Sequence, residues 1–145
     1  VPGGSSVPIL PANLIYKTAA GEDRLMSYES LSDGGFATGS MLGSGGFIVY
    51  DDRACIVRNT WNFSRFYHHE SCGQCTPCRE GTGWIDKILK KILKGDGSKE
   101  DLSTILDVCS TMNGKTVCVF APAVKDIIES IVKKFPQEFN AYLKN

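Results

Sequence analysis

The sequence has no net charge and no long hydrophobic run. Its sixteen Lys and Arg residues balance sixteen Asp and Glu residues, so no excess of positive charge predicts a nucleic-acid partner. No apolar run approaches the roughly 20 residues that span a bilayer, so we expect no direct membrane insertion. Nothing at the N-terminus is typical of a signal peptide, which favours an intracellular, reducing setting.

A dinucleotide-binding fingerprint is also missing, although the stretch from Ser32 to Gly46 is rich in glycine. In that fingerprint the glycines follow a strand and open a helix, so that the helix N-terminus faces the pyrophosphate. Here Gly43 to Gly46 precede the apolar run Phe47 to Tyr50, and no GxGxxG frame is present. We therefore interpret the stretch as a glycine-rich loop that leads into an edge strand. Its six glycines are Gly34, Gly35, Gly39, Gly43, Gly45 and Gly46.

Cysteine is abundant, and its distribution is uneven. Half of the six cysteines lie within seven positions, at Cys-x-x-Cys-x-x-Cys spacing. A disulfide framework is typical of small secreted chains with cysteines spread through loops, which this pattern does not match. The clustered residues are Cys72, Cys75 and Cys78, and the scattered ones are Cys55, Cys109 and Cys118.

The two parts of the chain differ in their patterns. The first, residues 1–51, is rich in Gly, Pro and Ser, and short apolar runs predict strands at Val7 to Leu10 and Phe47 to Tyr50. The second, residues 52–145, shows helical periodicity. With 42% apolar residues among 145, the chain can bury a real core, and we predict the α+β fold class.

Four amphipathic helices are predicted in the second part. The first covers Ala54 to Tyr67, and the second starts near Pro77 and ends before the Gly95-Asp96-Gly97 segment. Ser98 caps the third, which Gly114 stops, and Pro122 lies in the first turn of the fourth, which ends before Pro136. Short connections between them predict a compact bundle.

Three evenly spaced thiolates indicate a metal centre. Each two-residue gap turns the backbone enough to point successive sulfurs at a common object, as in proteins that hold iron-sulfur clusters. Zinc is the alternative, although its sites usually use paired Cys-x-x-Cys units or Cys/His pairs. We prefer a single 4Fe-4S cluster, and a zinc-stapled interaction module remains the second hypothesis.

A cubane cluster requires a fourth ligand, and we predict Cys118. Cys109 lies on the apolar stripe of the third helix, where a free cysteine behaves as a small hydrophobe. Cys55 lies near the start of the first helix, where partly buried packing is expected. Cys118 lies between Gly114 and Pro122, where no helical register fixes its side chain. The predicted ligands are therefore Cys72, Cys75, Cys78 and Cys118.

The neighbouring residues suit a buried, negatively charged centre. Backbone N–H groups around the triplet and the positive end of the following helix face the sulfurs. Arg79 either adds positive charge there or is a solvated first-turn residue. His68 and His69 are expected to pack or to form hydrogen bonds outside the set of ligands.

These segments resemble a known family. Ser64 to Gly81, with the sequence SRFYHHESCGQCTPCREG, is similar to the cluster motif of the NADH-binding flavoprotein subunit of respiratory complex I. Related subunits of NAD-linked hydrogenases and formate dehydrogenases share this motif. Pro2 to Ser6 and Met41 to Val49 resemble the family's soluble-ligand-binding β-grasp (SLBB) segment. Gly114 to Cys118 resembles the family's Gly-x-Thr-Ile-Cys, which carries the fourth ligand.

The resemblance implies a fold and a role. It implies a partial SLBB domain over residues 1–51, followed by a four-helix bundle over residues 52–145 that holds the cluster. In this family NADH reduces FMN, and single electrons leave through the 4Fe-4S cluster toward the next cluster and quinone. FMN and NADH bind an earlier domain that we expect to be missing from this chain, which by itself should not oxidise NADH.

The resemblance also implies partners and a location. The expected partners are the flavin/NADH domain of the parent subunit and neighbouring iron-sulfur subunits. The expected location is cytoplasmic, peripheral on the inner face of the membrane, or on the matrix side if mitochondrial. The chain departs from the family after Cys118, where Val119-Phe120-Ala121-Pro122-Ala123 replaces a Leu-Gly-Asp-Ala type of segment.

Overall fold

The computed structural model describes residues 1–13, 15–17, 22–25 and 39–144, and these residues are mostly helical. The chain divides into two compact units, Val1–Val49 and Tyr50–Asn145. The elements in chain order are β1 (Ile15–Lys17), β2 (Asp23–Leu25), α2 (Ile56–Glu70), α3 (Thr76–Leu93), α4 (Lys99–Met112), α5 (Phe120–Lys134) and α6 (Pro136–Asn140).

The regular structure of the first unit is a short antiparallel pair. Strand β1 pairs with β2 so that Ile15 lies opposite Leu25 and Lys17 lies opposite Asp23. The Lys17 ammonium donates to the Asp23 carboxylate across the pair at 2.8 Å. Both side chains are largely exposed, so this ion pair adds little to stability.

The strands predicted at Val7 to Leu10 and Phe47 to Tyr50 are wrong. Within the second run, Phe47 forms a single antiparallel bridge to Pro2. The ladder stops there because proline has no N–H to donate and because Gly3 turns the chain away with a φ of 67°. The first run is irregular: its apolar residues report burial rather than a strand. Gly34 and Gly35 lie outside the described residues.

The predicted helices are present, with shifted ends. Helix α2 begins two residues later than Ala54 and continues three residues past Tyr67, to Glu70. Ser98 caps α4 as predicted, in a full capping box with Asp101. Helix α6 has no counterpart among the predicted helices. Pro136 stops the fourth helix as expected, but proline also favours the first turn of a new one.

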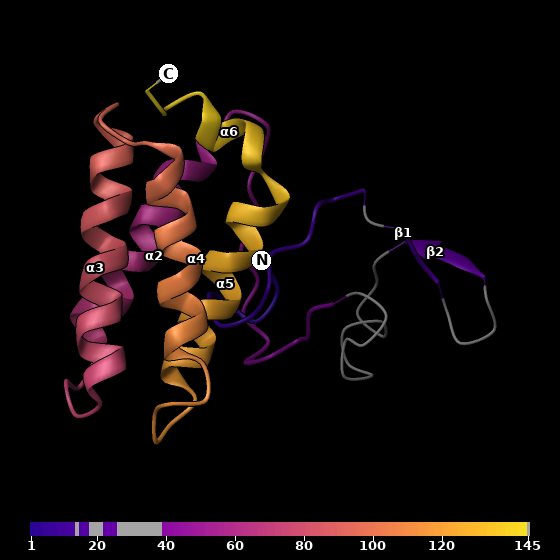
Figure 1. Cartoon of the computed structure of the whole chain (residues 1–145). Helices are drawn as coiled ribbons and strands as arrows, with labels where there is room; N and C mark the ends of the chain where they lie inside the picture. Colours follow the sequence, from indigo (N-terminus) through magenta and orange to yellow (C-terminus); the bar gives the residue numbers. More distant parts are fainter. Residues whose placement is uncertain (14, 18–21, 26–38, 145) are drawn as a thin grey trace. The chain divides into compact units, whose positions relative to one another are not determined.

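The long helices of the second unit pack side by side (Figure 1). Each of α2, α3 and α4 contacts the next helix in sequence, and α5 also contacts α2. Their shared core is fully buried and mainly aliphatic, which supplies most of the stabilisation by removing apolar area from water. Its largest members include Ile85, Leu89, Ile92, Ile105, Met112, Ile127, Ile128 and Ile131.

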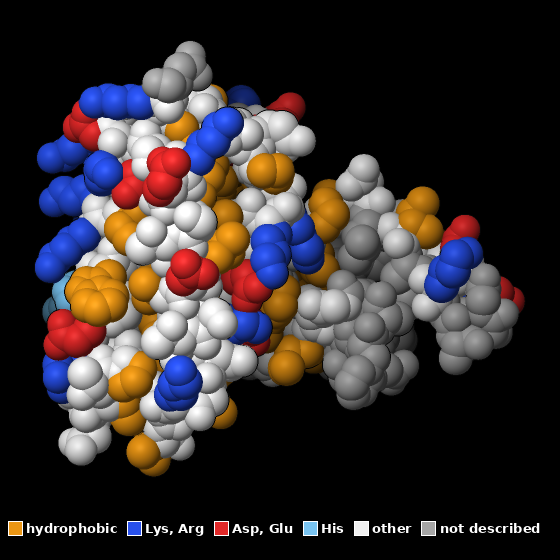
Figure 2. Space-filling view, in the orientation of Figure 1, with side chains coloured by type: hydrophobic (Ala, Val, Ile, Leu, Met, Phe, Trp, Pro, Cys, Tyr) orange, Lys and Arg blue, Asp and Glu red, His pale blue; other side chains and the backbone are white. Residues whose placement is uncertain are grey.

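The opposite face of α3 is polar, as its periodicity predicts. Lys87, Lys90, Lys91 and Lys94 are exposed, and Figure 2 shows Lys and Arg side chains along the outer edge of this helix. None of the helices formed by the described residues has the length and apolar character needed to span a bilayer.

Candidate metal centre

All four predicted ligands line one small pocket of about 190 Å³. Two segments form it, the connection from α2 to α3 and the loop from α4 to α5, which lie at the same end of the helices (Figure 1). The structure thus brings Cys118 to the triplet although 40 positions separate it from Cys78 in the sequence. The lining residues are Glu70, Ser71, Cys72, Cys75, Cys78, Thr116, Cys118 and Phe120.

The local sequence explains how the triplet reaches the pocket. Helix α2 ends at Glu70, and Gly73, with a φ of 77°, reverses the chain in a conformation that suits glycine. Cys75 is the N-cap of α3, and Pro77 lies in the first turn, where the absence of an N–H is harmless. Cys75 and Cys78 therefore lie at the positive end of the α3 dipole, which favours negatively charged sulfurs.

Arg79 braces the connection between the helices. Its guanidinium donates to the carbonyl oxygen of Gly73 at 2.8 Å and to the carboxylate of Glu80 at 2.9 Å. The side chain is 48% exposed, so it is partly solvated while it fixes the loop between Cys72 and Cys75. Each of the two roles considered for Arg79 therefore describes part of its environment.

Two of the sulfurs already have hydrogen-bond partners within the protein. The N–H of Val117 donates to Sγ of Cys75 at 3.5 Å, and Oγ of Ser71 lies 3.4 Å from Sγ of Cys78. Cys78 is buried, whereas Cys72 and Cys118 are exposed. The site therefore has a buried side at the start of α3 and an open side at the two loops.

The segment that departs from the family pattern forms one wall of the pocket. Phe120 lines it, and the Phe120 ring packs edge-on against Tyr67 of α2 with 5.2 Å between centroids. Val117 and Val119 are 94% and 80% exposed, on either side of Cys118. Apolar side chains thus cover the inner wall and also project into solvent beside the fourth cysteine.

The pocket fits a sulfur-ligated cluster in both chemistry and size. Its donor set is four thiols, and its volume of about 190 Å³ is several times the roughly 30 Å³ that one water occupies. The dipole of α3 offsets the negative charge that four thiolates bring. Among the described residues, no group of three or more His, Cys, Asp and Glu side chains is arranged to hold a metal ion.

The two remaining cysteines lie where packing was predicted. Cys109 is fully buried in α4, and burial raises the pKa of its thiol to about 12. Cys55 is the N-cap of α2, and its sulfur lies 3.2 Å from the hydroxyl of Tyr142. Neither residue lines the cysteine pocket.

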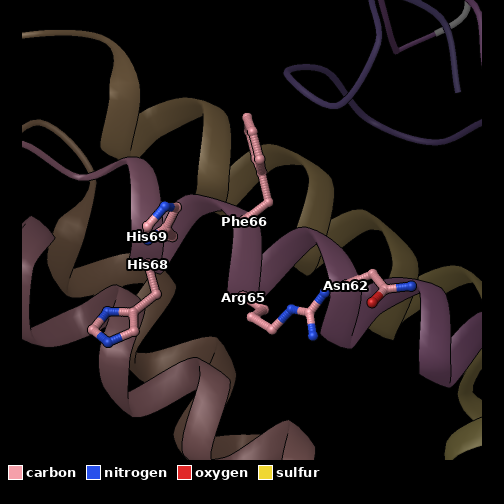
Figure 3. Close-up of a pocket in the computed structure, with 5 residues that line it drawn as sticks. All are labelled: Asn62, Arg65, Phe66, His68 and His69. Carbon is pink, nitrogen blue, oxygen red and sulfur yellow. The ribbon is translucent and has the colours of Figure 1, made fainter.

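The histidines lie outside the residues that line the cysteine pocket, as expected. Nδ1 of His68 lies 3.5 Å from the hydroxyl of Thr82, and the His69 side chain is 86% exposed. Both belong to a wide, open depression on α2 (Figure 3). Its lining residues are Asn62, Arg65, Phe66, His68 and His69.

Three lining residues were not predicted from the sequence as parts of the site. Ser71 and Thr116 each lie within two positions of a predicted ligand, so a search for hydroxyl side chains beside the cysteines would have found them. Phe120 gave no such signal, because an aromatic residue at the start of an apolar helix normally indicates core packing.

Comparison with known proteins gives a consistent result. A family model described as the NADH-ubiquinone oxidoreductase-F iron-sulfur binding region, of the 4Fe-4S type, matches residues 58–142. The chain is 40% identical over 144 residues to the F subunit of the NADH-quinone oxidoreductase of Rickettsia bellii, a match that covers 99% of this chain. It is 38% identical over 138 residues to a Rhizobium meliloti protein of the same name, which covers 95% of this chain.

A solved structure is similar over almost the whole chain. An NAD+-reducing [NiFe]-hydrogenase in the H2-reduced state aligns with a TM-score of 0.78 and 29% identity, covering 99% of this chain and 23% of the hydrogenase chain. The chain spans 32% of the length of the Rickettsia protein and 30% of the Rhizobium protein. The comparisons therefore concern one portion of these larger proteins.

Proposed function

Because the chain belongs to the family of the NADH-ubiquinone oxidoreductase-F iron-sulfur binding region, we propose that it is the electron-transfer portion of an NADH:quinone oxidoreductase flavoprotein subunit. When bound, the 4Fe-4S cluster would accept and release one electron at a time, between FMN and the next cluster. The observation that carries this proposal is the lining of one pocket by Cys72, Cys75, Cys78 and Cys118.

The residues of this chain would hold and shield the cluster. The four cysteines would supply thiolate ligands, three from the start of α3 and the connection before it, and one from the loop before α5. Arg79 would keep the loop between the first two ligands in place through its bond to Gly73. Phe120, packed on Tyr67, would exclude water from the inner wall, and a drier environment strengthens electrostatic interactions at the sulfurs.

The finer description of the fold is part of the proposal. We assign residues 1–51 to the C-terminal part of an SLBB β-grasp domain and residues 52–145 to a four-helix bundle. The separation into compact units at Val49 and Tyr50 supports a boundary in this region. Helices α2 to α5 supply the four members of the proposed bundle, and α6 is an addition at its C-terminal end.

The proposal includes partners and a location. A flavin- and NADH-binding domain of the same parent subunit would supply electrons, and neighbouring iron-sulfur subunits would accept them. The parent complex would be attached to the inner face of the membrane on the cytoplasmic side, or on the matrix side in mitochondria. This portion by itself is not expected to oxidise NADH, since FMN and NADH would bind elsewhere in the parent subunit.

A second candidate is the corresponding module of an NAD-linked hydrogenase. The TM-score of 0.78 with the NAD+-reducing hydrogenase favours it as a specific alternative. The role of the four cysteines is the same in both proposals. They differ in the final electron acceptor or donor, which the rest of the parent complex determines.

Visible absorption and EPR spectroscopy test the relay. The chain is purified anaerobically, reconstituted with iron and sulfide, and titrated with dithionite at controlled potential. We expect sulfur-to-iron charge-transfer absorption that bleaches on reduction and a reversible one-electron EPR signal. A colourless chain that binds one zinc and shows no signal would instead identify a structural, zinc-stapled module.

A further inference from the structure

Ser71 lies between the two helices that form the buried side of the pocket. It follows the last residue of α2, where its N–H donates to the carbonyl of Tyr67 at 3.1 Å. Its hydroxyl oxygen lies 3.4 Å from Sγ of Cys78 and accepts the N–H of Gly73 at 3.3 Å. The side chain thus touches a predicted ligand and also the loop that carries Cys72.

The direction of these hydrogen bonds follows from counting donors. A serine hydroxyl has one hydrogen and two lone pairs, and a backbone N–H can only donate. Gly73 therefore uses a lone pair of the hydroxyl and leaves its hydrogen free. A cysteine that binds a metal is a thiolate and can only accept. In the loaded protein the remaining hydrogen of Ser71 would therefore point to the sulfur of Cys78.

This sulfur needs a donor from the protein more than the others do. Cys72 and Cys118 are exposed, so water can donate to their sulfurs, whereas Cys78 is only 7% exposed. Cys75 receives the backbone N–H of Val117. Among the hydrogen bonds of the described residues, Ser71 makes the one side-chain hydroxyl contact to a predicted ligand sulfur.

We propose that the Ser71 hydroxyl donates a hydrogen bond to the sulfur of Cys78 and thereby raises the reduction potential of the bound cluster. The inference rests on the proposed function and deepens it. Reduction adds negative charge to the cluster and its sulfurs, and a donated hydrogen bond stabilises the more negative state more strongly. Ser71 is a positioning residue that acts through Cys78.

The test is an EPR-monitored potentiometric titration of the reconstituted chain and its Ser71→Ala variant. We expect Ser71→Ala to lower the midpoint potential by about 30 to 60 mV, a three- to tenfold change in the equilibrium constant for one electron. Ser71→Thr retains the hydroxyl and should keep the potential of the unaltered chain. Iron content and EPR line shape should not change, which separates tuning from loss of the cluster.

Thr116→Val is the matched control. Thr116 lines the same pocket, but its hydroxyl donates to the carbonyl of Cys118 at 3.0 Å and not to a sulfur. This nearly isosteric change should leave the potential unaltered. An equal potential in Ser71→Ala and the unaltered chain, or an equal shift in Thr116→Val, would overturn the inference.

The outcomes distinguish this inference from the function on which it rests. An unaltered chain without any cluster signal would refute the proposed function, whereas a normal cluster with an unshifted Ser71→Ala potential refutes only the role of Ser71. If Ser71→Ala loses its iron, pulsed EPR of the unaltered chain in D2O decides. A rapidly exchanging deuteron coupled to the cluster is expected, and its absence would contradict the hydrogen bond.

Discussion

The backbone N–H of Val117 donates to the sulfur of Cys75 at 3.5 Å, across 42 positions of the sequence. This contact joins the loop before α5 to the N-cap residue of α3. It places the neighbour of Cys118 against the triplet through the protein's own atoms. The convergence of the four cysteines therefore rests on packing and hydrogen bonding of the polypeptide.

Replacement of the fourth cysteine is the first test of the ligand set. We expect Cys118→Ser to abolish the 4Fe-4S signal or to convert it to a cluster with fewer irons, because one sulfur on the open side of the pocket is lost. Iron analysis and low-temperature EPR of the reconstituted variant measure this. A full 4Fe-4S signal in Cys118→Ser would show that the fourth ligand is another group.

Cys109→Ser is the matched control for that experiment. The residue is fully buried and does not line the pocket, so the variant should bind iron normally. It should lose about 1 to 3 kcal/mol of unfolding free energy, because a hydroxyl is placed in an apolar site. Loss of iron from Cys109→Ser alone would contradict the assignment.

A close approach of α3 and α4 predicts a steric effect at Gly81. A Cβ at this position would lie 2.4 Å from the sulfur of Met112, which is buried in the core. Gly81→Ala should therefore lower the free energy of unfolding by about 1 to 3 kcal/mol, despite the better helix propensity of alanine. Urea unfolding of the metal-free chain, followed by circular dichroism, measures the change.

Gly83→Ala provides the comparison two residues further along the same helix. Its Cβ would meet the ring of His68 at 2.9 Å, but His68 is exposed and its side chain can rotate away. The gain in helix propensity, up to about 1 kcal/mol, should then offset most of the strain. Equal losses in the two variants would mean that the contact with Met112 does not decide the result.

Thiol labelling should rank the cysteines by burial. In the metal-free chain, iodoacetamide at about pH 8 should modify the exposed Cys72 and Cys118 first. Cys109 should react only on unfolding, because burial raises its pKa to about 12 and leaves almost no thiolate. Peptide mass spectrometry gives the order, and early modification of Cys109 in the folded chain would contradict it.

The capping box of α4 predicts an acid-dependent stability. Burial of Asp101 by itself would raise the pKa of its carboxyl, but hydrogen bonds from Lys91 and from the N–H of Ser98 outweigh it and lower the pKa. A carboxyl with a lowered folded-state pKa stabilises the fold above about pH 4, its unfolded value, and this contribution disappears as the pH falls through the folded-state pKa.

Asp101→Asn measures that contribution. The variant should be less stable than the unaltered chain near neutral pH, by about 1 kcal/mol, since half-exposed Lys91 adds little through charge alone. The difference should shrink as the pH is lowered below about 4. Asp107→Asn, on an exposed position of the same helix, is the control. A difference for Asp101→Asn that is independent of pH would contradict the account.

Helices were predictable from the sequence, because their signals are local. The apolar spacing and the Ser98 cap fixed α4 without reference to any other part of the chain. The outcome at Phe47 was not predictable in the same way. A strand requires a partner, and here the partner segment begins with Pro2 and two glycines that end the pairing after one bridge.

The site was predictable to a different extent on its two sides. The spacing of Cys72, Cys75 and Cys78 indicated a common centre, and the absence of helical register at Cys118 indicated the fourth cysteine. The hydrogen bond from Val117 and the wall formed by Phe120 depend on how two distant loops meet. Such contacts arise from tertiary packing, to which no local pattern corresponds.

The most direct measurement is the content of iron and acid-labile sulfide in the anaerobically reconstituted chain, together with its integrated EPR signal after reduction. The account predicts about four irons, about four sulfides and one unpaired spin per chain, as a single 4Fe-4S cluster requires. One zinc per chain with no sulfide and no signal would contradict it.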